Sequence, residues 1–147
     1  MDSSPEVSAR CAELERLAPV CPRSVWKRTR LGEKDVLFLC GTIGAEFDVW
    51  QRKLAVTSAA DALLSQQIGL DAVEKVMDEL EKEVKVKIEG EGRKLKTRRS
   101  PGYGDLPLTL SRRILDELDA PRKIGVSITD SDLLVPTKSV TAICEIC

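Results

Sequence analysis

The segment from Arg98 to Asp105 carries the side chains of this sequence that are best suited to binding a small charged molecule. Arginine presents a fixed fork of N–H donors that matches a carboxylate, and a glycine such as Gly102 lets backbone amides approach a ligand closely. The aromatic face of Tyr103 can receive a flat ring or a cation. These residue types fit a site for a small zwitterion, but they also fit a proline–glycine turn with a surface arginine and a half-buried tyrosine.

Histidine is absent from the 147-residue chain. The chain therefore cannot supply an imidazole base, a Ser-His or Cys-His nucleophile pair, or the commonest transition-metal ligand. Its five cysteines are odd in number and scattered, which is typical of reduced thiols. Cys40 and Cys144 lie in apolar runs and are predicted to be core residues. Cys144 and Cys147 have the spacing of a metal-binding pair, but structural zinc takes four ligands, so we expect no metal site.

The charges balance over the chain as a whole but not along it. Lysine and arginine total 23 against 24 aspartate and glutamate, so the molecule has no overall field that attracts nucleic acid or an anionic membrane. The segment Arg93–Arg99 has five basic residues in seven, which keeps open an alternative function as a nucleic-acid-binding module. The chain has only five aromatic residues and no stacking series beside this patch, so we expect no nucleic-acid partner.

The most apolar windows, Val36–Cys40 and Leu133–Pro136, are far shorter than the roughly 20 residues that cross a bilayer. The start of the chain lacks the basic and then apolar sections of a signal peptide. We therefore expect no membrane partner and a cytoplasmic location.

Hydrophobic spacing predicts the elements of the first half of the chain. They are a helix capped by Ser3-Ser4 and ended by Pro19, strands at Val25–Arg30 and Asp35–Cys40, a turn at Gly41–Gly44, and helices at Phe47–Leu54 and Ser58–Ile68. Gly69 is predicted to separate the last helix from a further apolar stripe that runs from Val73 to Ile88. The alternation of Val84, Val86 and Ile88 leaves open a strand at the end of that stripe.

In the second half, Arg93–Arg99 is predicted to be a short strand and Asp105 to cap a helix that begins near Pro107 and turns Leu108, Leu115 and Leu118 inward. Short strands are predicted at Ile124–Ile128, Leu133–Val135 and Ser139–Ile146. Surface preference favours Lys138 as an exposed loop lysine, and the alternative is that it faces a cofactor or a partner. No repeat or long linker divides the chain. We expect an α+β fold in which helices pack on a curved, mostly antiparallel sheet.

Two blocks of the sequence resemble one known family. Arg98-x-x-x-Gly102-Tyr103, within the segment 98–108, resembles the S-adenosylmethionine motif of the activation domain of cobalamin-dependent methionine synthase, above all its short stand-alone versions. Residues 124–142 resemble the family stretch after the helix that follows this motif, and residues 37–44 resemble the preceding portion. The resemblance covers most of the chain and implies the fold of that activation domain.

The family resemblance also implies a function. Such a domain binds S-adenosylmethionine and supports reductive methylation of cob(II)alamin, with an electron from a flavodoxin-like donor. The cobalamin is carried by a partner methyltransferase module, so this chain would be a component of a methionine synthase system rather than an independent catalyst. The domain contributes positioning, which needs no histidine. An alternative client is another corrinoid methyltransferase of one-carbon metabolism.

The same resemblance assigns roles to individual residues. Arg98 corresponds to the family arginine that binds the methionyl carboxylate, and Tyr103 corresponds to the motif tyrosine. Pro101 and Gly102 correspond to the residues that shape the loop beside the nucleoside. A family acidic residue near the ligand falls on or close to Glu74, which also fits a solvated glutamate on a charged helix face. Arg99 competes for the carboxylate, but the motif spacing favours Arg98, and neighbours in a strand point to opposite faces.

The sequence also departs from the family pattern. The family's domain is usually longer on both sides, so we expect residues 1–147 to form a single activation-like domain that is shortened at both ends. The link between Arg30 and Asp35 is short. No residue corresponds to the early acidic side chain that faces the ligand's amino group.

Overall fold

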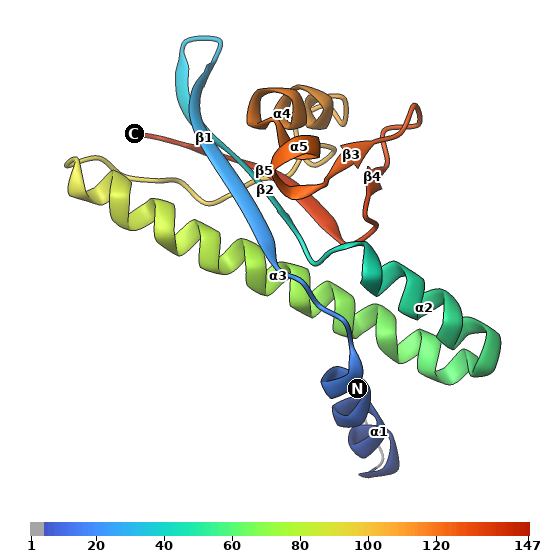
Figure 1. Cartoon of the computed structure of the whole chain (residues 1–147). Helices are drawn as coiled ribbons and strands as arrows, with labels where there is room; N and C mark the ends of the chain where they lie inside the picture. Colours follow the sequence, from blue (N-terminus) through green and yellow to red (C-terminus); the bar gives the residue numbers. More distant parts are fainter. Residues whose placement is uncertain (1–4) are drawn as a thin grey trace.

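The computed structural model describes residues 5–147 (Figure 1). The helices are α1 (Pro5–Leu17), α2 (Ala45–Thr57), α3 (Ala59–Gly90), α4 (Leu110–Leu118) and α5 (Ala120–Ile124), and the strands are β1 (Arg23–Leu31), β2 (Lys34–Thr42), β3 (Ser127–Ile128), β4 (Leu134–Val135) and β5 (Ser139–Glu145). An antiparallel sheet has the order β1-β2-β5, and β3 pairs with β4 in a separate hairpin. The predicted α+β class is confirmed, and the predicted cap at Ser3-Ser4 lies outside the described residues.

The central strand β2 is buried on both faces, which explains its continuous apolar run. Phe38 and its alternate neighbours pack against α4 and α5 in one core cluster. Leu37 and Leu39 pack against α3 in the other. Helices therefore cover both sides of the sheet, with the long α3 on one side and α4 and α5 on the other (Figure 1).

Helix α3 is continuous over 32 residues, so the predicted break at Gly69 is wrong. Gly69 lies in the helix where Phe47 of α2 packs against it, and a Cβ there would lie 2.6 Å from the Phe47 ring. The open question at the end of this element is also settled, because Val84 and Ile88 are buried on a helical stripe while Val86 is exposed. The glycine serves helix packing here and does not end the helix.

Residues 93–99 do not form the predicted strand, but they follow β5 along its outer edge. Lys96 N–H donates to Glu145 O, and Arg99 and Ile143 exchange two backbone hydrogen bonds of 2.8 Å. Between these bonds lie two residues of the segment, Thr97 and Arg98, opposite the single residue Cys144. This extra residue is a β-bulge, a feature that interrupts pairing and redirects a side chain.

Three further predictions fail for tertiary reasons. Asp105 does not cap α4, whose N-cap position is Thr109, because the Asp105 carboxylate pairs with Arg99. Lys138 is only 6% exposed, and its Nζ donates to Gln66 of α3 at 2.8 Å. Leu108 is exposed, whereas Leu115 and Leu118 are buried as predicted.

Two strand boundaries also differ from the prediction. Gly41 still belongs to β2, so the turn before α2 is shorter than predicted. The segment predicted as a strand at Ile124–Ile128 contains only β3, because Ile124 ends the short helix α5.

Cys40 and Cys144 are buried core residues, as predicted, and burial raises the pKa of each thiol to about 12. Within the described range, no three His, Cys, Asp or Glu side chains are grouped so that they could hold a metal ion. Among residues 5–147, no helix combines the length and the apolar character that crossing a bilayer requires.

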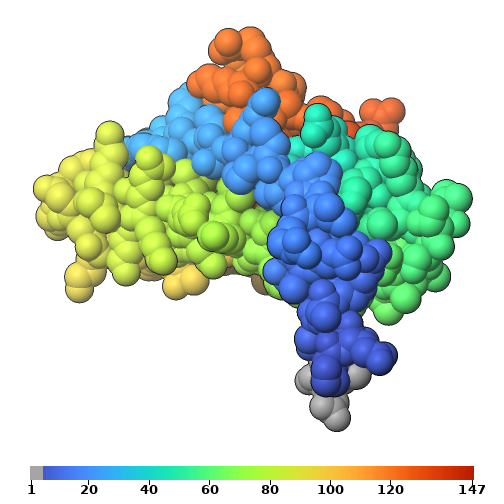
Figure 2. Space-filling model, turned by 60° about the horizontal axis from the view of Figure 1, so that its bottom comes forward, coloured from blue at the N-terminus to red at the C-terminus, as the bar shows by residue number. Residues whose placement is uncertain are grey.

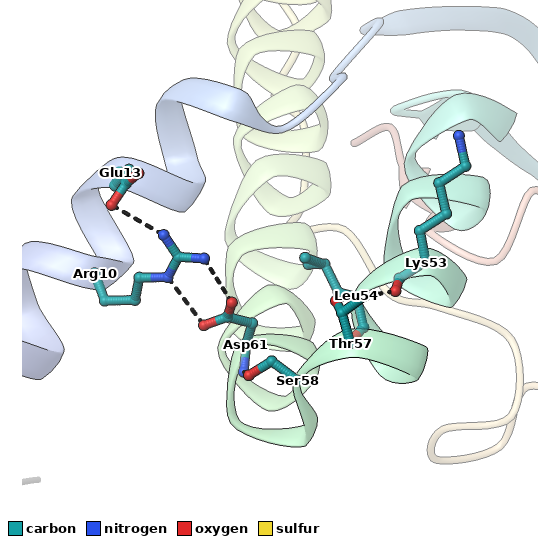
Figure 3. Close-up of polar contacts among 7 residues, drawn as sticks. All are labelled: Arg10, Glu13, Lys53, Leu54, Thr57, Ser58 and Asp61. Atoms are coloured by element: carbon teal, nitrogen blue, oxygen red, sulfur yellow. Dashed lines mark hydrogen bonds and ion pairs between the residues drawn. The ribbon is translucent and has the colours of Figure 1, made fainter.

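Helix α1 projects from the underside of the molecule (Figure 2). Leu14 is fully buried in the cluster that joins α1, α2 and α3. Arg10 also reaches the first turn of α3, where its Nε lies 3.0 Å from Asp61 Oδ1 and its Nη2 lies 2.6 Å from Asp61 Oδ2 (Figure 3). The Asp61 N–H donates to Ser58 Oγ, the N-cap of α3, so this ion pair ties α1 to a fixed helix end.

We predict that α1 loosens in acid. Hydrogen bonds from Arg10 hold the pKa of Asp61 below its ordinary value of 3.8. A carboxyl with a depressed folded-state pKa stabilises the fold fully above the unfolded value, and this stabilisation is lost as the pH falls through the folded pKa. Hydrogen exchange of the α1 amides, corrected for its intrinsic pH dependence, should therefore accelerate below about pH 4.

The variant Asp61→Asn should show faster α1 exchange already at neutral pH, with no further acid step. Asp71→Asn is the matched control, because Asp71 lies on the same helix and accepts from Gln67. Acid loosening that persists unchanged in Asp61→Asn would contradict this account of how α1 is held.

Candidate functional site

A pocket of about 330 Å³ lies where α3, the loop after residue 99, the β3–β4 hairpin and the start of β5 meet. Its volume is at the lower end of the range for small-molecule sites. Three of the predicted site residues line it, namely Glu74, Pro101 and Tyr103. The lining also includes Ser111, Asp132 and Thr141, none of which the sequence analysis singled out.

Arg98 lies beside this pocket and is held by α3. Its side chain is 16% exposed, and its guanidinium contacts three carboxylates of that helix. Nη2 lies 2.8 Å from Glu74 Oε2, while Nη1 lies 2.8 Å from Asp78 Oδ1 and 2.7 Å from Glu81 Oε1. Because Glu74 is the one of these acids that lines the pocket, the Nη2 side of the fork faces the pocket.

The bulge and α3 together fix the position of Arg98. The bulge places Arg98 opposite Cys144, whose side chain belongs to the core cluster on the α3 side of the sheet. Burial lowers the pKa of Arg98, but hydrogen bonds to Asp78 and Glu81 outweigh it, so the pKa lies above the ordinary value. The guanidinium is a permanent cation, and three carboxylates of α3 hold it in a fixed position at the edge of the pocket.

Arg99 has a different set of contacts from those of Arg98. Its Nη2 pairs with Asp105 in the following loop, and its backbone pairs with Ile143 of β5. The hydrogen bond from the Arg99 guanidinium also lowers the pKa of the Asp105 carboxyl. Arg99 therefore closes the loop on itself, and the structure places Arg98 rather than Arg99 next to Glu74.

The loop at residues 100–106 presents its aromatic side chain to solvent. Gly102 has φ +92°, a conformation that strongly favours glycine, and its N–H donates to Leu106 O at 2.9 Å. Pro101 is buried and forms part of the pocket wall. Tyr103 is 74% exposed, which is more than the half-buried tyrosine expected for a surface turn. Its ring is available to cover a molecule that enters the pocket.

The sequence contained a signal for the partners of Arg98. Glu74, Asp78 and Glu81 follow the spacing i, i+4, i+7 and so lie on one face of a helix. The signal does not say which basic residue this face meets. The Ser111–Thr141 contact joins residues 30 positions apart, and no local pattern marks it.

The basic segment Arg93–Arg99 is largely neutralised. Ion pairs connect four of its five basic residues to carboxylates, which are Arg93 to Asp35, Lys96 to Glu145, Arg98 to the acids of α3, and Arg99 to Asp105. These pairs remove the free positive charge that phosphate binding requires. The observation favours a small-molecule site over the nucleic-acid alternative.

A larger cavity of about 480 Å³ lies between α3 and the segment that joins α1 to β1, and none of the predicted site residues lines it. The motif residues Pro101 and Tyr103 are instead combined with Glu74 in the smaller pocket. The chemistry of the candidate site is therefore that of an arginine–glutamate pair at the edge of a pocket whose wall is partly apolar.

Comparison with known proteins relates this geometry to one fold. No protein-family model and no curated protein sequence matches the chain. The crystal structure of the MetH reactivation domain bound to AdoHcy does match, with a TM-score of 0.74 at 14% sequence identity, over 98% of this chain and 67% of that chain. The chain therefore has the fold of the MetH reactivation domain, as the block Arg98-x-x-x-Gly102-Tyr103 predicted.

Proposed function

We propose that this chain binds S-adenosylmethionine in the pocket beside Arg98 and acts as a reactivation subunit of cobalamin-dependent methionine synthase. One observation carries the proposal. The pocket is lined by motif residues Pro101 and Tyr103 together with Glu74, in a chain that shares its fold with a domain crystallised with AdoHcy. The cobalamin-binding methyltransferase module and a flavodoxin-like electron donor would be its partners.

The Arg98–Glu74 pair fits the amino-acid end of S-adenosylmethionine. That end carries a carboxylate and an ammonium group side by side. A guanidinium binds a carboxylate through charge-assisted hydrogen bonds, and a glutamate accepts from an ammonium group. We propose that this end of the ligand enters between the Nη2 group of Arg98 and Glu74, which lie 2.8 Å apart without it.

The remaining proposed contacts hold the nucleoside. Pro101 and Gly102 shape the loop beside it, and Tyr103 covers it. The bound S-adenosylmethionine supplies an electrophilic methyl group for the reduced cobalamin of the partner. The chain itself moves no proton in this function, because its role is to fix where that methyl group lies.

Glu74→Gln is predicted to weaken AdoHcy binding about fivefold, because the amide keeps the size of the side chain but loses the charge that attracts the ammonium group. Asp78→Asn is the matched control, since Asp78 contacts Arg98 but does not line the pocket. Methylthioadenosine lacks the amino-acid end and should bind both variants equally. Tighter AdoHcy binding by Glu74→Gln would mean that Glu74 only competes with the ligand for Arg98.

A reconstitution experiment tests the proposed role. The purified chain is mixed with a cobalamin-dependent methionine synthase that lacks its own activation domain and holds cob(II)alamin, together with a reducing system. We expect the spectrum of methylcobalamin to appear only when both this chain and S-adenosylmethionine are present. A chain that binds S-adenosylmethionine but restores no cobalamin enzyme would overturn the subunit role while leaving the binding proposal in place.

A further inference from the structure

Two buried hydroxyl groups meet at the wall of the candidate pocket. Ser111 comes from the first turn of α4 and Thr141 from β5, and both residues are 4% exposed. Their Oγ and Oγ1 atoms lie 2.9 Å apart, and either can be the donor. Both residues line the pocket that also contains Glu74 and Tyr103. The pair thus lies on the α4 side of the sheet, across the pocket from α3.

A count of protons shows that this pair has one donor left over. Each hydroxyl has one proton to donate, and the bond between the two oxygens uses only one of them. Among residues 5–147, the side chains of Ser111 and Thr141 make no other hydrogen bond. Buried donors are almost always paired in folded proteins, so the remaining O–H needs an acceptor. Both residues line the pocket, so a molecule in the pocket can provide the acceptor.

The neighbouring pocket residues indicate what kind of acceptor fits. Val73, Leu134 and Val140 line the pocket with the hydroxyl pair. A flat heteroaromatic base can pack its apolar faces on these side chains and offer the hydroxyl pair a ring nitrogen that only accepts, whereas a ribose hydroxyl would bring a further donor of its own beside the pair. The lining therefore favours a base over a sugar next to the hydroxyl pair.

We propose that the Ser111–Thr141 hydroxyl pair recognises the adenine base by donating its unshared O–H to one ring nitrogen. This inference rests on the proposed binding of an adenosyl ligand in the pocket. It goes beyond that proposal by naming the side chains that recognise the base. It also fixes the direction in which the ligand lies: the amino-acid end is at Arg98, and the base extends toward α4.

The test measures the affinity of AdoHcy and of its 1-deaza, 3-deaza and 7-deaza analogues for the full chain by calorimetry. Ser111→Ala and Thr141→Val each remove one hydroxyl, and we expect each to weaken AdoHcy binding about fivefold to tenfold, because the variant loses either the group that donates to the base or the group that orients this donor. The double variant should lose little more than either single variant, because the two groups act as a unit. One of the three deaza analogues should bind the unchanged chain as weakly as AdoHcy binds the single variants. The affinity of this analogue should not change in either variant.

Ser65→Ala is the matched control, because Ser65 is fully buried but its Oγ donates to Ala62 O outside the pocket. This control should bind AdoHcy normally even if it lowers stability. Equal weakening of all three deaza analogues by Ser111→Ala and Thr141→Val, or no weakening of AdoHcy, would overturn the base-reading role while the proposed function stands. Failure of the unchanged chain to bind AdoHcy would overturn both.

Discussion

Replacing Arg98 by alanine is expected to weaken the binding of S-adenosylmethionine and AdoHcy at least about tenfold, or about 1.4 kcal/mol. The change removes the cation that the bulge and α3 hold beside the pocket. It also leaves Glu74, Asp78 and Glu81 as neighbouring negative charges, which repel the ligand carboxylate that the arginine attracts. Calorimetric titration with AdoHcy measures this effect directly.

Two further variants separate the ligand contact from a general loss of structure. Arg98→Lys keeps the positive charge but cannot reach Glu74 and Glu81 with one planar fork, so we expect an intermediate affinity. Arg99→Ala removes the neighbouring guanidinium, which pairs with Asp105, and should bind AdoHcy like the unchanged chain. If Arg99→Ala lost affinity and Arg98→Ala did not, the assignment of the two arginines would be reversed.

Gly69→Ala is expected to destabilise the fold by about 1–3 kcal/mol, although alanine is the better helix former. A Cβ at this position would lie 2.6 Å from the ring of Phe47 and 2.9 Å from Cε of Lys138. Phe47 is fully buried and cannot turn aside without disturbing the α2–α3 contact. Chemical denaturation with matched m-values gives the change in free energy of unfolding.

Gly90→Ala is the control for this prediction. Gly90 ends the same helix, and nothing lies within 4 Å of the Cβ that the substitution would add. Helix propensity alone then acts, so the variant should be unchanged or more stable by up to about 1 kcal/mol. Stabilisation by Gly69→Ala of the same size as in Gly90→Ala would show that α2 does not pack on Gly69 as described.

Sequence patterns predict the parts of the fold that depend on local periodicity. The apolar run of β2 marks a strand with two covered faces, and the pairing of β1 with β2 across Gly32 follows from chain proximity. The prediction fails where a contact with a residue distant in the sequence decides the local structure. Gly69 does not break its helix because Phe47 occupies the space beside it, and Lys138 is buried because Gln66 accepts from its ammonium group.

The candidate site divides in the same way. Arg98, Gly102 and Tyr103 lie within six residues, so a local motif could mark them. The contact of Arg98 with Glu74 depends on a bulge, and a bulge requires the pairing of two segments that are about 45 residues apart in the sequence. The Ser111–Thr141 pair depends on the packing of α4 against β5, which no local spacing encodes.

Tyr103 provides the most direct measurement, because it is the single tyrosine of the chain and it lines the candidate pocket. Nuclear magnetic resonance of the protein with labelled tyrosine rings follows this one side chain during a titration with AdoHcy. We predict that its ring signals shift and saturate, and that Arg98→Ala moves the midpoint of the shift to at least about tenfold higher ligand concentration. Ring signals that stay unchanged at millimolar AdoHcy would contradict the assignment of this pocket as the binding site.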